Sequence, residues 1–187
     1  MFFEGYTRKQ WEREPEQLKP ELAKRIPVRY NRDNRYFSDR YQGIPVEGYT
    51  SLTSNILNHD NISLLLKCDY FTVRKELSAD IIVYTGELDA FFDKCFGNLE
   101  YRSVRFEFRT MEQEKYQPAA VVNYPNDYDW TRITEFKYFT GEPNSKTTIC
   151  LEFPIASGEP YYTVPTEENA QRREKYMEKV AQLEKTR

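Results

Sequence analysis

The second half of the chain alternates apolar and polar residues with a period of two, and this feature constrains the fold most. Val104, Phe106 and Phe108 alternate with polar neighbours across residues 103–109. A period of two is that of a strand with one buried face. Consecutive strands with short links between them indicate an antiparallel sheet. Further strands are predicted at residues 119–124, 131–139 and 148–153, with a hairpin turn at 141–145.

Helices are predicted before and after these strands. Apolar residues recur at helical spacing in residues 50–58 and 88–96. Thr166 is a typical helix cap, and it is followed by acidic residues and, about five turns later, by basic ones. This order of charge suits the dipole of a helix over 166–187. Short apolar strands are predicted at 62–66 and 81–84, and Pro15 and Pro20 are expected to break the charged run 12–24 into helical turns.

Together these patterns predict an α+β fold. We expect a twisted antiparallel sheet of about five or six strands, flanking helices and an irregular helical N-terminal arm. In the last strand, Ile149, Leu151 and Phe153 are predicted to share one face. The expected organisation is a partial helical domain with a mobile arginine-containing loop at 1–58, an antiparallel-sheet domain at 59–165 and a C-terminal helix at 166–187.

Residues 25–50 combine five arginines with five aromatic residues. Pro27 and Pro45 prevent a long helix in this stretch. Guanidinium groups bind phosphate oxygens through paired hydrogen bonds, and tyrosine rings stack on bases. The stretch therefore fits either a nucleotide or nucleotide-sugar site or a solvent-exposed surface loop, and its chemistry alone leaves both open.

Composition excludes several classes of function. Cys68, Cys95 and Cys150 are odd in number and widely spaced, which is typical of reduced thiols in a cytoplasmic protein. One histidine, His59, and no cluster of ligands argue against a metal site and against a Ser/His/Asp set. We expect no signal peptide and no membrane span. A single-stranded nucleic-acid module is an alternative that the net charge of −3 disfavours.

Several long motifs resemble those of one enzyme family. RIPVR begins at Arg25, and NRYFSDRYQGIPVEGYTSL occupies residues 34–52. GYTRKQW precedes them, and YTGELDAFFD, LEYRS, TRITEFKYF and EPYYTVP come later in the chain, in the same order as in the family. The chain is identified on these motifs as a member of the UDP-galactopyranose mutases, which are flavoenzymes.

The resemblance implies an isomerase that interconverts UDP-galactopyranose and UDP-galactofuranose. In the family, reduced FAD attacks the anomeric carbon through its N5 atom and UDP leaves. Protein groups hold the base and the diphosphate and exclude water. The chain has no GxGxxG fingerprint and matches roughly the middle-to-late half of a mutase. We therefore expect it to supply the uridine and diphosphate clamp, not to retain FAD, and to lack mutase activity by itself.

The resemblance also implies roles for particular residues. Arg25 and Arg132 match two arginines that hold the diphosphate, and we expect them to meet at one hollow. Tyr162 matches a tyrosine on the phosphates, with Tyr161 as the alternative. The stretch Tyr84, Thr85 and Gly86 matches a segment near FAD. The remaining matches to substrate-binding positions are Tyr6, Thr7, Trp11, Tyr36, Phe37 and Asn123.

Two further hypotheses concern the whole chain. It could be a non-enzymatic partial homologue that binds a UDP-sugar, or one half of a split mutase. In each case UDP-galactose or UDP is the expected ligand, and neither nucleic acid nor a membrane is an expected partner. Apolar residues near the two ends, Phe2, Phe3 and Leu183, predict self-association or association with a missing flavin-binding half.

Overall fold

The computed structural model describes the backbone of residues 2–25, 29–33, 35 and 37–185, and their side chains apart from 2, 23 and 25. The chain divides into two units. Residues 1–36 and 87–187 form the first, which we call the sheet unit, and residues 37–86 form the second, which we call the middle unit. The three domain ranges expected from the sequence stay a prediction.

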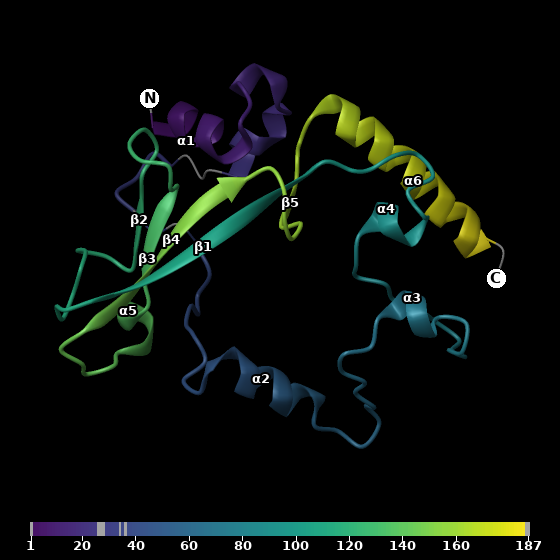
Figure 1. The fold of residues 1–187 in the computed structure, drawn as a ribbon, viewed down its shortest axis with the longest axis horizontal. Coiled ribbons are helices and arrows are strands. Elements are labelled where there is room, and N and C mark those ends of the chain that lie inside the picture. The colour runs from purple at the N-terminus through teal and green to yellow at the C-terminus, as the bar shows by residue number, and fades with distance from the viewer. Residues whose placement is uncertain (1, 26–28, 34, 36, 186–187) are drawn as a thin grey trace. The chain divides into compact units, whose positions relative to one another are not determined.

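A five-stranded antiparallel sheet organises the sheet unit (Figure 1). The order across the sheet is β2-β3-β4-β1-β5, and the long strands β1 and β4 pair over nine positions, from Ser103 opposite Ile155 to Met111 opposite Thr147. The prediction of an α+β fold with an antiparallel sheet is confirmed. The strands are Tyr101–Met111 (β1), Val121–Asn123 (β2), Arg132–Glu135 (β3), Thr147–Ile155 (β4) and Tyr162–Thr163 (β5).

Several helices of the sheet unit begin at the predicted signals. The N-terminal arm is helical, as predicted, and its two 3-10 turns begin at Pro15 and Pro20. Thr166 accepts a hydrogen bond from the Asn169 amide at 3.3 Å, which caps the last helix as predicted. The helices are Phe2–Trp11 (α1), Pro15–Gln17 (η1), Pro20–Arg25 (η2), Leu88–Phe91 (α4), Lys137–Thr140 (α5) and Glu167–Lys185 (α6).

The core of the sheet unit lies on one face of the sheet. Ile133, Ile149 and Leu151 are buried together there, and Phe153 packs against them. The predicted shared face of β4 is therefore confirmed. The expected burial of the alternating residues in β1 is wrong in part, because Phe106 and Phe108 are 42% and 64% exposed. Register explains the difference, since the two phenylalanines lie opposite Glu152 and Cys150, on the face of the sheet away from Ile149 and Leu151.

A second cluster joins the N-terminal arm to the strand before α6. Trp11, Leu18 and Val164 are buried together, and Tyr162 packs against them. This cluster holds α1 close to the sheet, and α1 also contacts β4. Three of the residues predicted to bind substrate belong to α1, so the packing of this helix sets their place beside the sheet.

Two predicted elements of the sheet unit are shorter than expected. The helix predicted over 88–96 ends at Phe91, because Asp93 and Lys94 have φ values of 52° and 55°, which a helix cannot continue through. The strand predicted over 131–139 ends at Glu135 and is followed by the helical turn α5. Gly141, with a φ of 67°, ends that turn, a conformation that favours glycine.

The middle unit contains two helices, Gly48–Leu57 (α2) and Tyr70–Val73 (α3). The predicted helix at 50–58 is confirmed. Asp69 caps α3 by accepting hydrogen bonds from the amides of Phe71 and Thr72. The strands predicted at 62–66 and 81–84 are wrong for the residues that the structure describes, where both runs pair with no other strand. A strand requires a neighbour for its backbone hydrogen bonds, and this unit supplies none.

Candidate functional site

Strand pairing aligns four residues in one row across the sheet. Asn123 in β2 lies opposite Arg132 in β3, and Arg132 lies opposite Glu152 in β4. Glu152 in turn lies opposite Phe106 in β1. Directly opposite residues of antiparallel strands share a face. This row therefore occupies the face away from the Ile149 and Leu151 core, and it contains two of the residues predicted to bind substrate.

Arg132 and Glu152 form the charged centre of the row. Their Nε and Oε2 atoms are 2.8 Å apart, and the Glu152 side chain is the less exposed of the two. The contact is an ion pair rather than a hydrogen bond, because the Arg132 Nε–H is not aligned with an acceptor. The Arg132 Nε atom is itself buried against Glu152, so the partly exposed remainder of the guanidinium is the part that can meet an anion.

Helix α1 places Tyr6 next to this ion pair. The Tyr6 hydroxyl forms a hydrogen bond with the Thr131 side chain. It also interacts electrostatically with the charges of Arg132 and Glu152. Burial raises the pKa of Tyr6, and the positive charge of Arg132 acts against that increase. Tyr6 therefore stays a neutral hydrogen-bonding phenol at physiological pH.

Two aromatic residues predicted from the EPYY motif complete the site. Tyr162 lies in β5, and its ring meets the buried Trp11 ring edge to face at 6.3 Å. Tyr161 is half-exposed, and its ring meets Phe106 edge to face at 5.9 Å. The row on the sheet is therefore bordered by aromatic rings from α1 and from the segment around β5. We call this set the clamp face: Tyr6, Trp11, Phe106, Asn123, Arg132, Glu152, Tyr161 and Tyr162.

The other predicted residues are not all placed. Thr7 is half-buried on α1 beside Tyr6. Tyr36 and the side chain of Arg25 lie outside the described residues, so the pairing of Arg25 with Arg132 stays a prediction. Phe37 is exposed in the middle unit, as are Thr85 and Gly86.

Two members of the clamp face were not predicted from the sequence. Glu152 and Phe106 each occur within an alternating strand, where such a residue resembles an ordinary surface or core position. Only register shows that Glu152 lies opposite Arg132. The available signal was the position of Glu152 between the core residues Leu151 and Phe153, which puts it on the opposite face.

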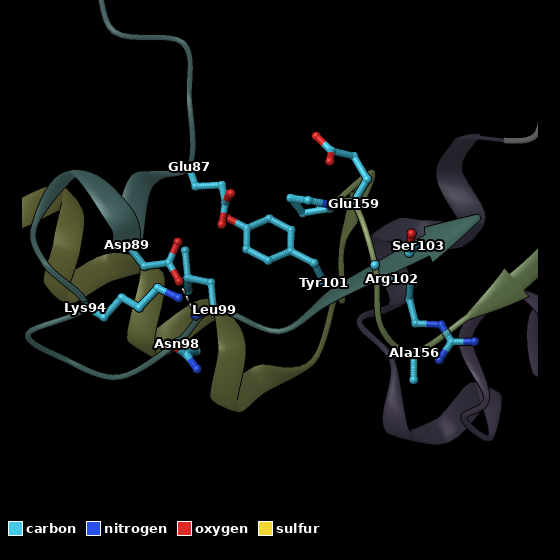
Figure 2. A pocket seen from close by; sticks show the side chains of 12 residues that line it. Glu87, Asp89, Lys94, Asn98, Leu99, Tyr101, Arg102, Ser103, Ala156 and Glu159 are labelled. Atoms are coloured by element: carbon cyan, nitrogen blue, oxygen red, sulfur yellow. Dashed lines mark hydrogen bonds between the residues drawn. The ribbon is translucent and has the colours of Figure 1, made fainter. Parts of the chain in front are cut away.

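A separate hollow of about 280 Å³ lies where α4, β1 and the β4–β5 link meet (Figure 2). Figure 2 shows the Tyr101 ring projecting into it near Glu87, with the Arg102 guanidinium directed away. Arg102 instead forms an ion pair with Glu12 at 2.9 Å. None of the described residues predicted to bind substrate lines this hollow, so it is distinct from the clamp face.

Other classes of site have no counterpart in the part of the chain that the structure describes. Its residues contain no group of three or more histidine, cysteine, aspartate or glutamate side chains arranged to hold a metal ion. No helix among the same residues has the length and apolar character that crossing a membrane requires.

Comparison with known proteins matches the chain to one family. The family model described as UDP-galactopyranose mutase covers residues 1–187. A probable UDP-galactopyranose mutase of Klebsiella pneumoniae is 42% identical in an alignment of 168 positions that covers 87% of this chain and 43% of the relative. The dTDP-fucopyranose mutase of Escherichia coli is 39% identical in an alignment of 173 positions that covers 87% of this chain and 46% of the relative.

A UDP-galactopyranose mutase of Mycoplasma genitalium is 30% identical in an alignment of 200 positions that covers 97% of this chain and 50% of that protein. The chain thus spans about half the length of the curated relatives it matches. The family match extends over all of this chain, including the motifs that place Tyr6, Arg132 and Tyr162 together on the clamp face. The chain belongs to the UDP-galactopyranose mutase family.

Proposed function

We propose that the clamp face binds the nucleoside diphosphate part of a UDP-hexopyranose, and that the chain is a substrate-binding portion of a mutase. The observation that carries this proposal is the row that pairs Arg132 with Asn123 and Glu152 beneath Tyr6 of α1. A partly exposed guanidinium at the edge of an aromatic surface suits a pyrophosphate joined to a base.

The proposed division of labour follows from the chemistry of each group. Arg132, together with Arg25, neutralises the diphosphate, which is also the leaving group when the sugar is released. Tyr6 and Tyr162 donate hydrogen bonds from their hydroxyl groups, and the buried Trp11 ring supports Tyr162 from behind. Thr7, Tyr36, Phe37, Asn123 and Tyr161 are proposed as further substrate contacts.

FAD supplies the nucleophile in the family, and Tyr84, Thr85 and Gly86 match a segment near it. The residues described there do not fit a dinucleotide site by themselves. A Cβ added at Gly86 would lie 2.4 Å from the Tyr84 hydroxyl, so the Tyr84 side chain fills the space beside this glycine. The proposed role of this chain is therefore binding and orientation of the substrate, without a step through FAD.

The substrate of the E. coli relative suggests a second candidate. That relative is named dTDP-fucopyranose mutase, and its identity to this chain is close to that of the K. pneumoniae relative. The two nucleotides differ in the methyl group of thymine and in the ribose. Tighter binding of dTDP than of UDP would favour a dTDP-hexopyranose as the substrate.

Calorimetric titration with UDP tests the proposal. We expect Arg132→Ala to weaken UDP binding about 10- to 100-fold, because a hydrogen-bonded charge pair contributes about 1.5–3 kcal/mol. Arg25→Ala should weaken binding in the same way.

Arg109→Ala is the matched control. Arg109 is also a strand arginine paired with a glutamate, Glu107, but it lies opposite Ile149 and therefore on the other face of the sheet. UDP affinity should not change in this variant. Equal affinity of the wild type and of Arg132→Ala would contradict the proposal.

A further inference from the structure

Two lysines of the sheet unit each donate to three main-chain carbonyl groups. Lys9 of α1 places its Nζ atom 2.5 Å from the carbonyl oxygen of Tyr124, 2.7 Å from that of Asp127 and 3.0 Å from that of Trp130. Lys137 of α5 is the counterpart, and its Nζ atom binds the carbonyl groups of Glu114, Asn144 and Lys146. An ammonium group has three N–H donors, so each lysine can use all of them to hold a loop.

The loop that Lys9 holds leads into the centre of the clamp face. It runs over residues 124–131, between Asn123 at the end of β2 and Arg132 at the start of β3. The Tyr124 amide donates to the Thr131 carbonyl at 2.8 Å, and the Thr131 amide donates to the Glu152 carbonyl at 2.8 Å. A displacement of this loop would therefore be transmitted to Thr131 and to the Arg132–Glu152 pair next to it.

A second contact holds the same helix against the same loop. A Cβ added at Gly5 would lie 2.0 Å from the Asn126 side-chain oxygen and 3.0 Å from the Pro125 carbonyl oxygen. Gly5 and Lys9 are four residues apart, and residues at this spacing lie on the same side of a helix. The loop is therefore set against one side of α1 by close approach at Gly5 and by the ammonium group at Lys9.

We propose that Lys9 is a positioning residue of the clamp face: it fixes the loop 124–131 to α1 and thereby sets Arg132 at a defined place relative to Tyr6 and Trp11. This inference rests on the proposed function for its consequence in binding. Lys9 acts through the loop and is not assigned a contact with the substrate. The two halves of the clamp, one from the helix and one from the sheet, are joined through its ammonium group.

The first experiment requires no ligand. Lys9→Met keeps most of the side-chain length and removes the charge and the donors. We expect amide hydrogen exchange at Tyr124 and Thr131 to accelerate about tenfold or more, because a network of charged hydrogen bonds is lost. The Arg132 Nε–H signal in nuclear magnetic resonance should shift and exchange faster.

Lys137→Met is the matched control for this experiment. It removes an equivalent contact from the loops around residues 114 and 144–146, so exchange should rise there and not at Tyr124, Thr131 or Arg132. Gly5→Ala disturbs the loop 124–131 without touching a charge and should shift the same Arg132 signal. Unchanged exchange at Thr131 and an unchanged Arg132 signal in Lys9→Met would overturn the inference.

The second experiment measures coupling in UDP binding. We expect Lys9→Met to weaken UDP binding about tenfold and Lys137→Met to leave it unchanged. In the Lys9→Met background, Arg132→Ala should cost much less affinity than it does in the wild type, since a displaced arginine contributes little to binding. Strictly additive effects would show that Lys9 does not act through Arg132.

The two experiments separate the inference from the proposed function. A wild-type chain that does not bind UDP contradicts the proposed function, and the exchange measurements still decide whether Lys9 positions Arg132. A wild-type chain that binds UDP, with Lys9→Met binding equally well, contradicts the inference alone.

Discussion

The sheet unit and the middle unit have similar apolar residues but bury them very differently. Leu151 in β4 is 1% exposed, whereas Leu65, in an equally apolar run of the middle unit, is 71% exposed. No residue from 37 to 86, all of which the structure describes, is buried. The difference lies in neighbours, because β4 pairs with β3 and β1 while residues 62–66 and 81–84 pair with no described strand.

This comparison shows that an apolar run specifies burial only where another element covers it. Continuous apolar runs such as residues 81–84 are typical of strands that are buried on both faces. Antiparallel strands with an alternating pattern require packing on one face only. In β3 and β4, side chains from neighbouring loops and strands pack over Ile133 and Leu151. The middle unit therefore has the composition of a core without the layers that would make one.

The largest expected contrast is in core substitutions. Leu151→Ala should lower the free energy of unfolding by about 2–5 kcal/mol, because it leaves a cavity between Ile133 and Ile149. Leu65→Ala should change it by less than about 0.5 kcal/mol, because the side chain is exposed. Urea denaturation followed by circular dichroism measures both values. A large cost for Leu65→Ala would show that the middle unit has a core in solution, contrary to the difference in burial described above.

The buried carboxylate of Glu135 leads to a second prediction, a smaller effect on the free energy of unfolding that depends on pH. Glu135 is fully buried and accepts hydrogen bonds from the Thr147 hydroxyl and from the amides of Tyr116 and Gln117. Burial alone would raise the pKa of Glu135, but these donated hydrogen bonds outweigh it and hold the pKa below its ordinary value of 4.5. The stability that this carboxylate contributes is therefore present above pH 4.5 and is lost as the pH falls through the lower folded-state pKa.

Glu135→Gln tests that assignment. The variant should lose about 1–3 kcal/mol of unfolding free energy at pH 7, because a buried acceptor is replaced in part by a donor. Its stability should also fall less steeply than that of the wild type on acidification. Glu47→Gln in the middle unit, where the exposed Glu47 accepts a hydrogen bond from the Ser51 hydroxyl, should change neither quantity. Parallel acid unfolding curves for the wild type and Glu135→Gln would contradict the assignment.

The smallest expected effect concerns association. We propose that the exposed apolar runs of the middle unit drive association with a second copy or with a polypeptide that supplies the flavin-binding half. Leu65→Lys should weaken that association about tenfold, because burial of one leucine contributes about 1.5–3 kcal/mol. Light scattering over a dilution series measures the change. A monomeric wild type at all concentrations, with and without a flavin-binding half, would exclude this association.

Much of the fold was predictable because it depends on local pattern. The alternation around Phe106 predicted β1, Thr166 predicted the start of α6, and the prolines predicted the 3-10 turns of the N-terminal arm. The predicted helix over 88–96 is longer than the observed one, because no residue type in that stretch indicates the left-handed conformations at Asp93 and Lys94. The strand β5 was not predicted at all, since two residues carry no period and become a strand only by pairing with β1.

In the candidate site, too, some residues could be predicted from the sequence and others only from the fold. Family motifs identified Tyr6, Trp11, Arg132 and Tyr162 as separate matches, and the fold brings these four together. The sequence could not identify Glu152 as the partner of Arg132, because the segment between them includes a helical turn that the pattern did not predict. It also offered no reason to select Lys9, which resembles any basic residue in the last turn of a helix.

By itself, the sequence determined the family, the alternating strands and the start of the last helix, because motifs, periodicity and caps act over a few residues. Only the tertiary structure decided which face of each strand is buried, which acid meets Arg132, and which loop receives the ammonium group of Lys9. Those contacts join residues that are 20 to 121 positions apart, from Glu152 and Arg132 to Lys9 and Trp130. Their energies depend on distance and alignment in space, which a linear pattern does not contain.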